Sequence, residues 1–114
     1  MPNHDPLVRL LHMRDYAKQA LEMASGKSRE ELDNNAMFRL ALTRLIELVG
    51  EAASQYPRQL QAQYPQIPWP KLISMRNRLI HGYDFVDNDI LWEAITKNLP
   101  QLLYELERII PAGM

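Results

Sequence analysis

The sequence concentrates ionisable and hydrogen-bonding side chains in one short segment, residues 76–83, which reads Arg-Asn-Arg-Leu-Ile-His-Gly-Tyr. Arginine offers a fixed positive charge and a planar set of donors that suits a phosphate group. Histidine exchanges protons near neutral pH, and asparagine can orient a neighbouring group by hydrogen bonding. These residue types predict chemistry at a phosphate, with Arg76, Asn77 and His81 as candidate catalytic residues. Arg78 could hold a neighbouring phosphate or could equally be a surface charge.

The spacing within this segment limits how its side chains can meet. Asn77 and His81 are four residues apart, so they share one face of a helix. Arg76 and His81 are five apart, which corresponds to a rotation of about 140° on a regular helix. One regular helix therefore does not aim both at a single atom. Either the helix unwinds at Gly82, or the site combines residues of two chains across a two-fold axis.

Other polar candidates fit structural roles better. Glu47 and Glu51 lie four apart in a helical segment, where a carboxylate pair could suggest acid–base chemistry or a metal. The better interpretation is that Glu51 supports the site, by hydrogen-bonding one of its arginines or by lying near a dimer seam. The three histidines, His4, His12 and His81, show no ligand spacing, and the chain has no cysteine. We therefore expect no metal and no cofactor.

The length and composition of the chain limit the kinds of protein that could carry this site. A chain of 114 residues predicts a single domain, residues 1–114. The formal net charge of -1 argues against a large phosphate-tracking surface, but it leaves room for a local cluster of arginines. No stretch approaches the roughly 20 apolar residues of a membrane span, and no signal peptide is visible. With no cysteine, these features predict a cytoplasmic protein that does not contact the membrane.

Helical periodicity and capping signals account for the first half of the chain. Asp5-Pro6 starts a helix that ends at Ser25-Gly26, and Ser28 caps a second helix with Glu31 completing a capping box. From Ala36 the segment is apolar around much of its circumference, which predicts the central helix of a bundle. Gly50 lies inside that helix and suggests close approach by another helix.

The segment with the polar side chains is predicted to lie on the next helix. Trp69 lies just outside that helix as a packing anchor, Pro70 opens it, and Gly82 ends it after His81. Asp87 is a candidate cap for a last helix, in which Pro100 should cause a kink. No segment alternates with period two. The fold class is therefore all-α, a bundle of four to five helices.

The polar segment and the helices around it resemble those of a known protein family. The pattern Arg76-x4-His81-x-Tyr83, with Asn77 in the polar position after the arginine, resembles the HepT-like branch of the HEPN superfamily. Further positions match that branch, and the resemblance extends from Leu7 to Leu106. These positions are Trp69, Gly50-Glu51-Ala52, Trp92 and Pro100.

The resemblance implies a fold, an activity and partners. HEPN domains are up-and-down helical bundles that dimerise, with the two motifs lining a shared cleft, and they cleave RNA without a metal. HepT-like toxins belong to type VII toxin–antitoxin systems. An MntA-like nucleotidyltransferase antitoxin transfers AMP from ATP onto the motif tyrosine, which here would be Tyr83. The expected partners are thus an RNA substrate such as tRNA, the antitoxin and a second copy of the chain, with no role for DNA.

The mechanism that we hypothesise assigns one role to each motif residue. His81 acts as general base or acid while the RNA 2′-hydroxyl attacks the phosphate. Arg76 stabilises the charge that develops on the phosphate, and Asn77 orients either His81 or the phosphate. AMP on Tyr83 would add negative charge and bulk to the cleft, which should repel and block RNA.

A competing interpretation is a non-catalytic helical partner of a nucleotidyltransferase, which the low net charge would suit. The intact Arg76–His81 pair separates the two, because a scaffold has no physical need for it. A plain helical adaptor would leave the polar cluster unexplained.

Overall fold

In a computed structural model of the chain, the structure describes residues 5–81 and 87–114. Those residues form helices joined by short connections, and they contain no β-strand. The predicted all-α class is therefore confirmed. In chain order the elements are α1 (Pro6–Ala24), α2 (Arg29–Asn34), α3 (Ala36–Gln55), α4 (Arg58–Gln61), α5 (Trp69–His81), α6 (Asn88–Glu93), η1 (Ala94–Asn98) and α7 (Leu99–Ile109).

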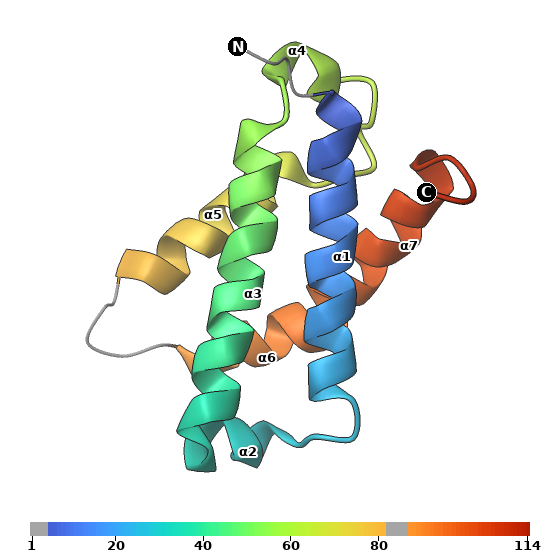
Figure 1. The fold of residues 1–114 in the computed structure, drawn as a ribbon. Helices are drawn as coiled ribbons and strands as arrows, with labels where there is room; N and C mark the ends of the chain where they lie inside the picture. Colours follow the sequence, from blue (N-terminus) through green and yellow to red (C-terminus); the bar gives the residue numbers. More distant parts are fainter. Residues whose placement is uncertain (1–4, 82–86) are drawn as a thin grey trace.

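Helix α3 is the centre of the bundle, as its apolar sequence predicts. It packs on α1, α2, α5 and α6, while α7 packs on the other side of α1. Figure 1 shows α1 and α3 side by side along most of their length, with α5 crossing α3 and α7 crossing α1. The α3 side chains that fill the core include Leu42, Ile46 and Val49, which are completely buried.

Side-chain caps start the helices where the sequence predicts them. The Asp5 carboxylate accepts a hydrogen bond from the Leu7 amide at 2.9 Å, directly before α1. The Asn35 side chain accepts one from the Phe38 amide at 3.1 Å and so separates α3 from α2. Each cap satisfies an amide that the first helical turn leaves without a partner.

Helix α5 begins one residue earlier than predicted, at Trp69. Trp69 is nonetheless the expected anchor, because its ring stacks on Tyr56 with 4.9 Å between centroids and an interplanar angle of 9°. Its indole nitrogen donates to the backbone carbonyl groups of Gln61 and Tyr64, at 3.2 Å each. These contacts fix the first turn of the helix that carries the polar segment.

The predicted kink at Pro100 takes the form of a π-helical segment. The turn widens at η1, which ends two residues before the proline, and the Leu99 amide donates to the carbonyl of Ala94, five residues back. A proline cannot donate to the carbonyl four residues before it and would clash with that group in a regular helix. The wider π turn removes this conflict, so one predicted helix becomes α6, η1 and α7.

Two sequence predictions fall on residues 82–86, outside the described part of the chain: the helix stop at Gly82 and the placement of Tyr83. Among the helices that are described, none is long and apolar enough to cross a membrane.

Candidate functional site

Arg76 lies where α5 packs most closely on α3. The side chains of Leu72, Met75 and Leu79 on α5 are buried and belong to the hydrophobic core. Next to this buried stripe, the Cβ of Arg76 faces Gly50 of α3. Gly50 is buried and has no side chain, so the backbones of the two helices can approach each other here. The prediction that Gly50 permits close approach by another helix is confirmed.

The guanidinium of Arg76 is held by three side chains. Its Nη1 donates to Glu51 Oε2 at 2.6 Å and to Ser54 Oγ at 3.4 Å. Its Nε and Nη2 donate to Asn77 Oδ1 at 3.1 and 2.8 Å. The Glu51 side chain in turn accepts a hydrogen bond from Gln55 at 3.1 Å. Arg76 therefore has one orientation, fixed by α3 on one side and by its own neighbour on the other.

This arrangement confirms one of the two roles predicted for Glu51, the hydrogen bond to a motif arginine. The carbonyl oxygen of Asn77 also orients Arg76, while the role hypothesised for Asn77 at His81 or the phosphate stays a prediction. Four of the five guanidinium N–H groups are directed at these partners. The bond to Ser54 is the longest of the four, so it is the one that an incoming phosphate oxygen would replace most easily.

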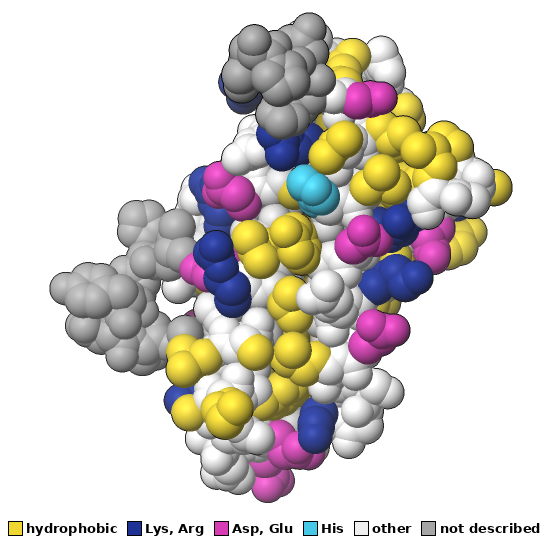
Figure 2. Space-filling view, viewed as in Figure 1, with side chains coloured by type: hydrophobic (Ala, Val, Ile, Leu, Met, Phe, Trp, Pro, Cys, Tyr) yellow, Lys and Arg dark blue, Asp and Glu magenta, His cyan; other side chains and the backbone are white. Residues whose placement is uncertain are grey.

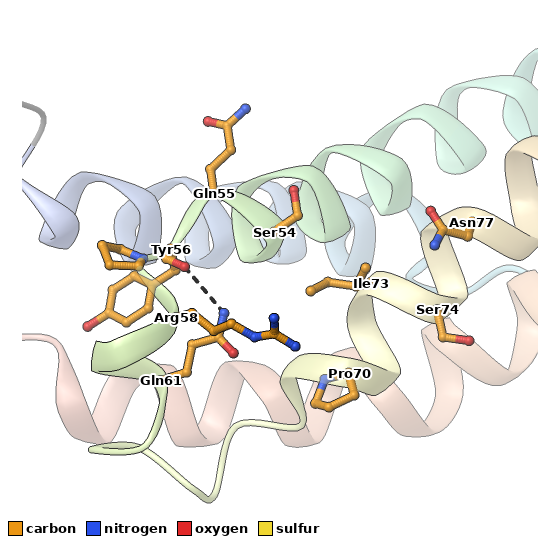
Figure 3. A pocket seen from close by; sticks show the side chains of 10 residues that line it. Ser54, Gln55, Tyr56, Arg58, Gln61, Pro70, Ile73, Ser74 and Asn77 are labelled. Atoms are coloured by element: carbon orange, nitrogen blue, oxygen red, sulfur yellow. Dashed lines mark hydrogen bonds between the residues drawn. The ribbon is translucent and has the colours of Figure 1, made fainter.

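Arg76 lies between two hollows in the surface. A groove of about 680 Å³ runs between the end of α3, α4 and the first half of α5, and both Ser54 and Asn77 line it. Figure 3 shows these side chains around the groove. On the other side, a hollow of about 250 Å³ is lined by Arg76 itself together with Arg44, Glu47, Leu48 and Glu51. An anion could thus reach the guanidinium from solvent.

The remaining motif residues lie elsewhere on α5 or beyond it. Arg78 is exposed and lines a separate small hollow with Lys71 and Glu93, so the structure does not bring it together with Arg76. Helix α5 stays helical through His81, which means that positions 76 and 81 differ by the rotation of five helical residues. The side chain of His81 and all of Tyr83 lie outside the described residues.

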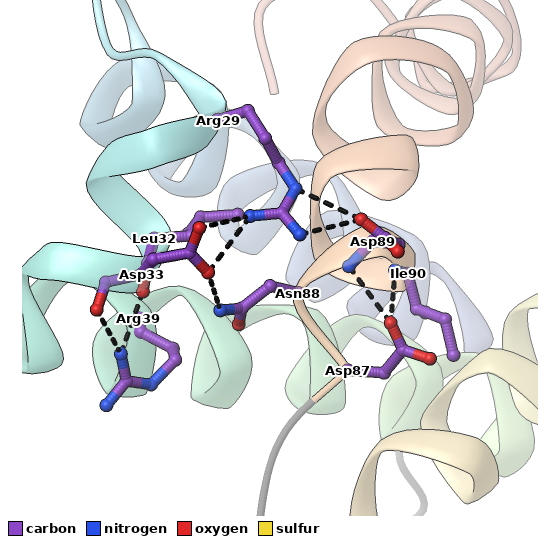
Figure 4. Close-up of polar contacts among 8 residues, drawn as sticks. All are labelled: Arg29, Leu32, Asp33, Arg39, Asp87, Asn88, Asp89 and Ile90. Carbon is purple, nitrogen blue, oxygen red and sulfur yellow. Dashed lines mark hydrogen bonds and ion pairs between the residues drawn. The ribbon is translucent and has the colours of Figure 1, made fainter.

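A second polar cluster holds the start of α6, where the described chain resumes after residue 86. Arg29 of α2 pairs with Asp89 at 2.6 Å and with Asp33 at 3.1 Å, and Asn88 donates to Asp33 at 2.8 Å. Figure 4 shows this network between α2 and α6. The Asp87 carboxylate accepts from the amides of the first turn of α6 and confirms the predicted cap.

Hydrogen bonds and ion pairs within this cluster shift the pKa values of Asp33 and Arg29. The Asn88 amide and the Arg29 guanidinium together lower the pKa of the Asp33 carboxyl below its ordinary value of 3.8. Hydrogen bonds from Arg29 to Asp89 and Asp33 raise the pKa of that guanidinium. Each shift favours the charged form, so the ion pairs persist near neutral pH.

Sequence patterns did not identify Ser54, Arg58 or the Arg29–Asp33–Asn88–Asp89 cluster. Arg58 and Ser54 lie on α4 and α3, and they reach the groove beside Asn77 only because α3 and α5 pack together. Spacing along the chain carries no signal for such contacts. The residues described by the structure hold no group of three or more His, Cys, Asp or Glu side chains suited to a metal.

Known proteins resemble this chain over most of its length. "Putative RNase MJ1216" of Methanocaldococcus jannaschii is 33% identical over 110 residues, covering 96% of this chain and 91% of that protein. "Putative RNase TTE0752" of Caldanaerobacter subterraneus is 30% identical over 101 residues, covering 89% and 90%. "Probable ribonuclease HepT" of Thermococcus cleftensis is 34% identical over 71 residues, covering 62% and 64%. No solved structure gives a significant match.

A family model described as "Ribonuclease HepT-like" matches residues 13–109, which include α3, α5 and the whole polar segment. The match covers the helices that fix Arg76 as well as the motif itself. The chain therefore belongs to the HepT-like ribonuclease family of the HEPN superfamily.

Proposed function

We propose that this protein is a metal-independent endoribonuclease whose active site is built from Arg76 and His81. The observation that carries the proposal is the fixed guanidinium of Arg76, held by Glu51 and Asn77 and open to solvent between two hollows. In a chain of the HepT-like family, an immobilised cation that can stabilise negative charge developing on a phosphate supports phosphodiester cleavage.

In the proposed reaction, His81 transfers a proton and Arg76 stabilises a negative charge. His81 takes the proton of the RNA 2′-hydroxyl as general base, or delivers one to the leaving 5′-oxygen as general acid, and solvent water carries the other of these two protons. The 2′-oxygen forms a bond to phosphorus and the bond to the 5′-oxygen breaks, which leaves a 2′,3′-cyclic phosphate. Arg76 stabilises the extra negative charge on the phosphate oxygens, and Asn77 and Glu51 keep its guanidinium oriented.

The active unit is proposed to be a homodimer. Of the two alternatives for the site we favour the one that combines two chains, because α5 is helical through His81 and Arg76 and His81 of one chain then point in different directions. Helix α3 also exposes large apolar side chains: Met37 is 83% and Leu40 is 59% exposed. Figure 2 shows hydrophobic side chains gathered on the face formed by α3 and α1. A two-fold axis along α3 would bury this surface and bring the two Arg76 sites closer together.

The biological setting is proposed from the family. Tyr83 follows His81 by two residues, as in the HepT-like pattern, so it is the proposed acceptor of AMP from an MntA-like nucleotidyltransferase antitoxin. The protein would then be the toxin of a type VII pair that acts on RNA in the cytoplasm. Adenylylation of Tyr83 would add negative charge and bulk to the motif, which should repel and block RNA.

The experiment incubates the purified protein with RNA in the presence of a chelator and compares it with His81→Ala. His12→Ala is the matched control, since it removes an imidazole from α1 that lies next to Tyr16. Cleavage by the wild type and the control, but not by His81→Ala, is the expected result. Full activity of His81→Ala would remove this residue from the mechanism, and an inactive wild type that still binds a nucleotidyltransferase would favour the scaffold alternative.

A further inference from the structure

The proposed mechanism makes no use of most of the groove beside Arg76. Its volume of about 680 Å³ falls in the range of about 300–1,000 Å³ that is typical of small-molecule sites. It extends along α5 from Pro70 to Asn77, a rise of roughly 10 Å at 1.5 Å per residue. The groove is therefore large enough for a nucleotide unit.

The charged side chain that lines this groove, Arg58, is positive. Arg58 is exposed at its wall, and within the described part of the chain no carboxylate pairs with that guanidinium. Among the side chains that line the groove, none is aspartate or glutamate. Figure 3 shows Arg58 extending from α4 toward α5. A guanidinium without a competing carboxylate is a suitable partner for a phosphate.

The rest of the lining suits a base and a sugar. Gln55, Ser74 and Asn77 supply amide and hydroxyl groups, while Ile73 and Pro70 supply apolar surface. Proteins that recognise single-stranded RNA combine contacts of this kind, with flat or apolar surface against the base and polar groups at its edges. A groove for a bare anion would have no need of the apolar wall.

The groove is continuous with the proposed catalytic centre. Ser54 and Asn77 both line it, and both accept hydrogen bonds from Arg76. A phosphate at Arg76 would thus lie at the end of the groove, and the strand could continue along α5 toward Arg58. We propose that the groove binds the nucleotide next to the cleaved phosphodiester and that Arg58 binds the phosphate of this nucleotide. The inference rests on the proposed ribonuclease function.

A binding experiment tests the subsite without requiring cleavage. The probe is a short oligoribonucleotide with 2′-O-methyl groups, which cannot form the cyclic phosphate, and fluorescence anisotropy is measured over a range of salt concentrations. Loss of one phosphate contact should lower the slope of log Kd against log salt by about 0.7 for a single strand. We expect this change for Arg58→Gln. An unchanged slope would overturn the role of Arg58.

Arg108→Gln is the matched control for this measurement. Arg108 lies on α7, pairs with Glu105 at 3.5 Å, and has a side chain that is 63% exposed. It lines none of the hollows beside α5, so its loss should leave the salt slope as in the wild type. An equal change in both variants would mean that only the overall charge matters and would contradict a defined subsite.

A cleavage experiment then separates the subsite from the catalytic centre. The substrates are a ribodinucleotide without terminal phosphates, which has the cleaved phosphate but no second phosphate for Arg58, and a longer oligoribonucleotide. Arg58→Gln should raise KM for the longer substrate about tenfold to hundredfold, as expected for a lost charged hydrogen bond, and leave dinucleotide cleavage unchanged. A second variant, Ser74→Phe, should also raise KM for the longer substrate, because it fills the groove from an exposed position.

The two proposals fail in different ways. If the wild type binds the oligonucleotide but cleaves neither substrate, the ribonuclease function is wrong for this protein. The salt dependence of Kd, compared between the wild type and Arg58→Gln, still tests the role of Arg58 in binding. If the wild type cleaves both substrates and Arg58→Gln matches it on each, the subsite is wrong and the ribonuclease function stands.

Discussion

A methyl group on Gly50 would lie 2.5 Å from the Cβ of Arg76, a distance that real side chains do not tolerate. The same methyl group would lie 2.9 Å from the carbonyl oxygen of Leu72. Gly50 therefore sets the spacing between α3 and α5 at the residue that we propose as the catalytic cation. Glu51, the next residue on α3, forms the ion pair with the same arginine at 2.6 Å.

Gly50→Ala should damage both stability and activity. Alanine favours a helix over glycine by about 1 kcal/mol, but overpacking at a helix contact costs about 1–3 kcal/mol and would push α5 outward. We expect a lower midpoint of urea unfolding and a fall in kcat. Ala36→Ser, which adds one atom at an exposed position of the same helix, should leave both unchanged. Wild-type stability and rate in Gly50→Ala would show that the two helices can separate freely.

Glu51→Gln tests the orientation of Arg76. The Glu51 side chain is 50% exposed, so losing the ion pair should change the free energy of unfolding by no more than about 1 kcal/mol. A mobile guanidinium should nevertheless lower kcat about tenfold, with a smaller effect on KM. The control is Glu47→Gln, which removes only the 3.8 Å pair with Arg44. Equal kinetics in the two variants would argue against a positioning role for Glu51.

The Arg29–Asp33–Asn88–Asp89 cluster predicts a pH dependence. Because the folded state lowers the pKa of Asp33 below 3.8, the contacts add stability at higher pH, and this contribution is lost as the pH falls through the folded-state pKa. Asp33→Asn should therefore be less stable than the wild type near neutral pH, and the difference should shrink in acid. Urea denaturation of both proteins, near neutral pH and in acid, measures the difference in their free energies of unfolding. A difference that stays constant would exclude Asp33 ionisation as its cause.

The proposed dimer predicts that substitutions at two exposed apolar residues have unequal effects on assembly and activity. Leu40→Asp places a charge on α3 where the two copies would meet, so it should give a folded monomer with little activity. Tyr104→Asp changes an equally exposed side chain on α7, 62% against 59%, and should remain dimeric and active. Light scattering coupled to size-exclusion chromatography, together with circular dichroism, measures assembly and folding. An active Leu40→Asp dimer would place the interface elsewhere.

Local sequence signals predicted most helix boundaries because the groups involved are neighbours in the chain. Asp5, Asn35 and Asp87 lie within a few residues of the amides that they cap, and no distant contact is needed. The break near Pro100 was predicted for the same reason, although its π-helical form was not. The start of α5 differed by one residue because Trp69 is fixed by contacts with Tyr56, Gln61 and Tyr64.

By itself the sequence determined the helical class, the family pattern and the identity of Arg76, Asn77 and His81 as candidates, since periodicity and residue type are properties of the chain alone. Only the tertiary structure decided how Arg76 is used. Its contacts with Gly50, Glu51 and Ser54, and the groove shared with Arg58, arise where α3 and α5 pack together. Such contacts depend on the distance between helices that are far apart in sequence, which no local pattern encodes.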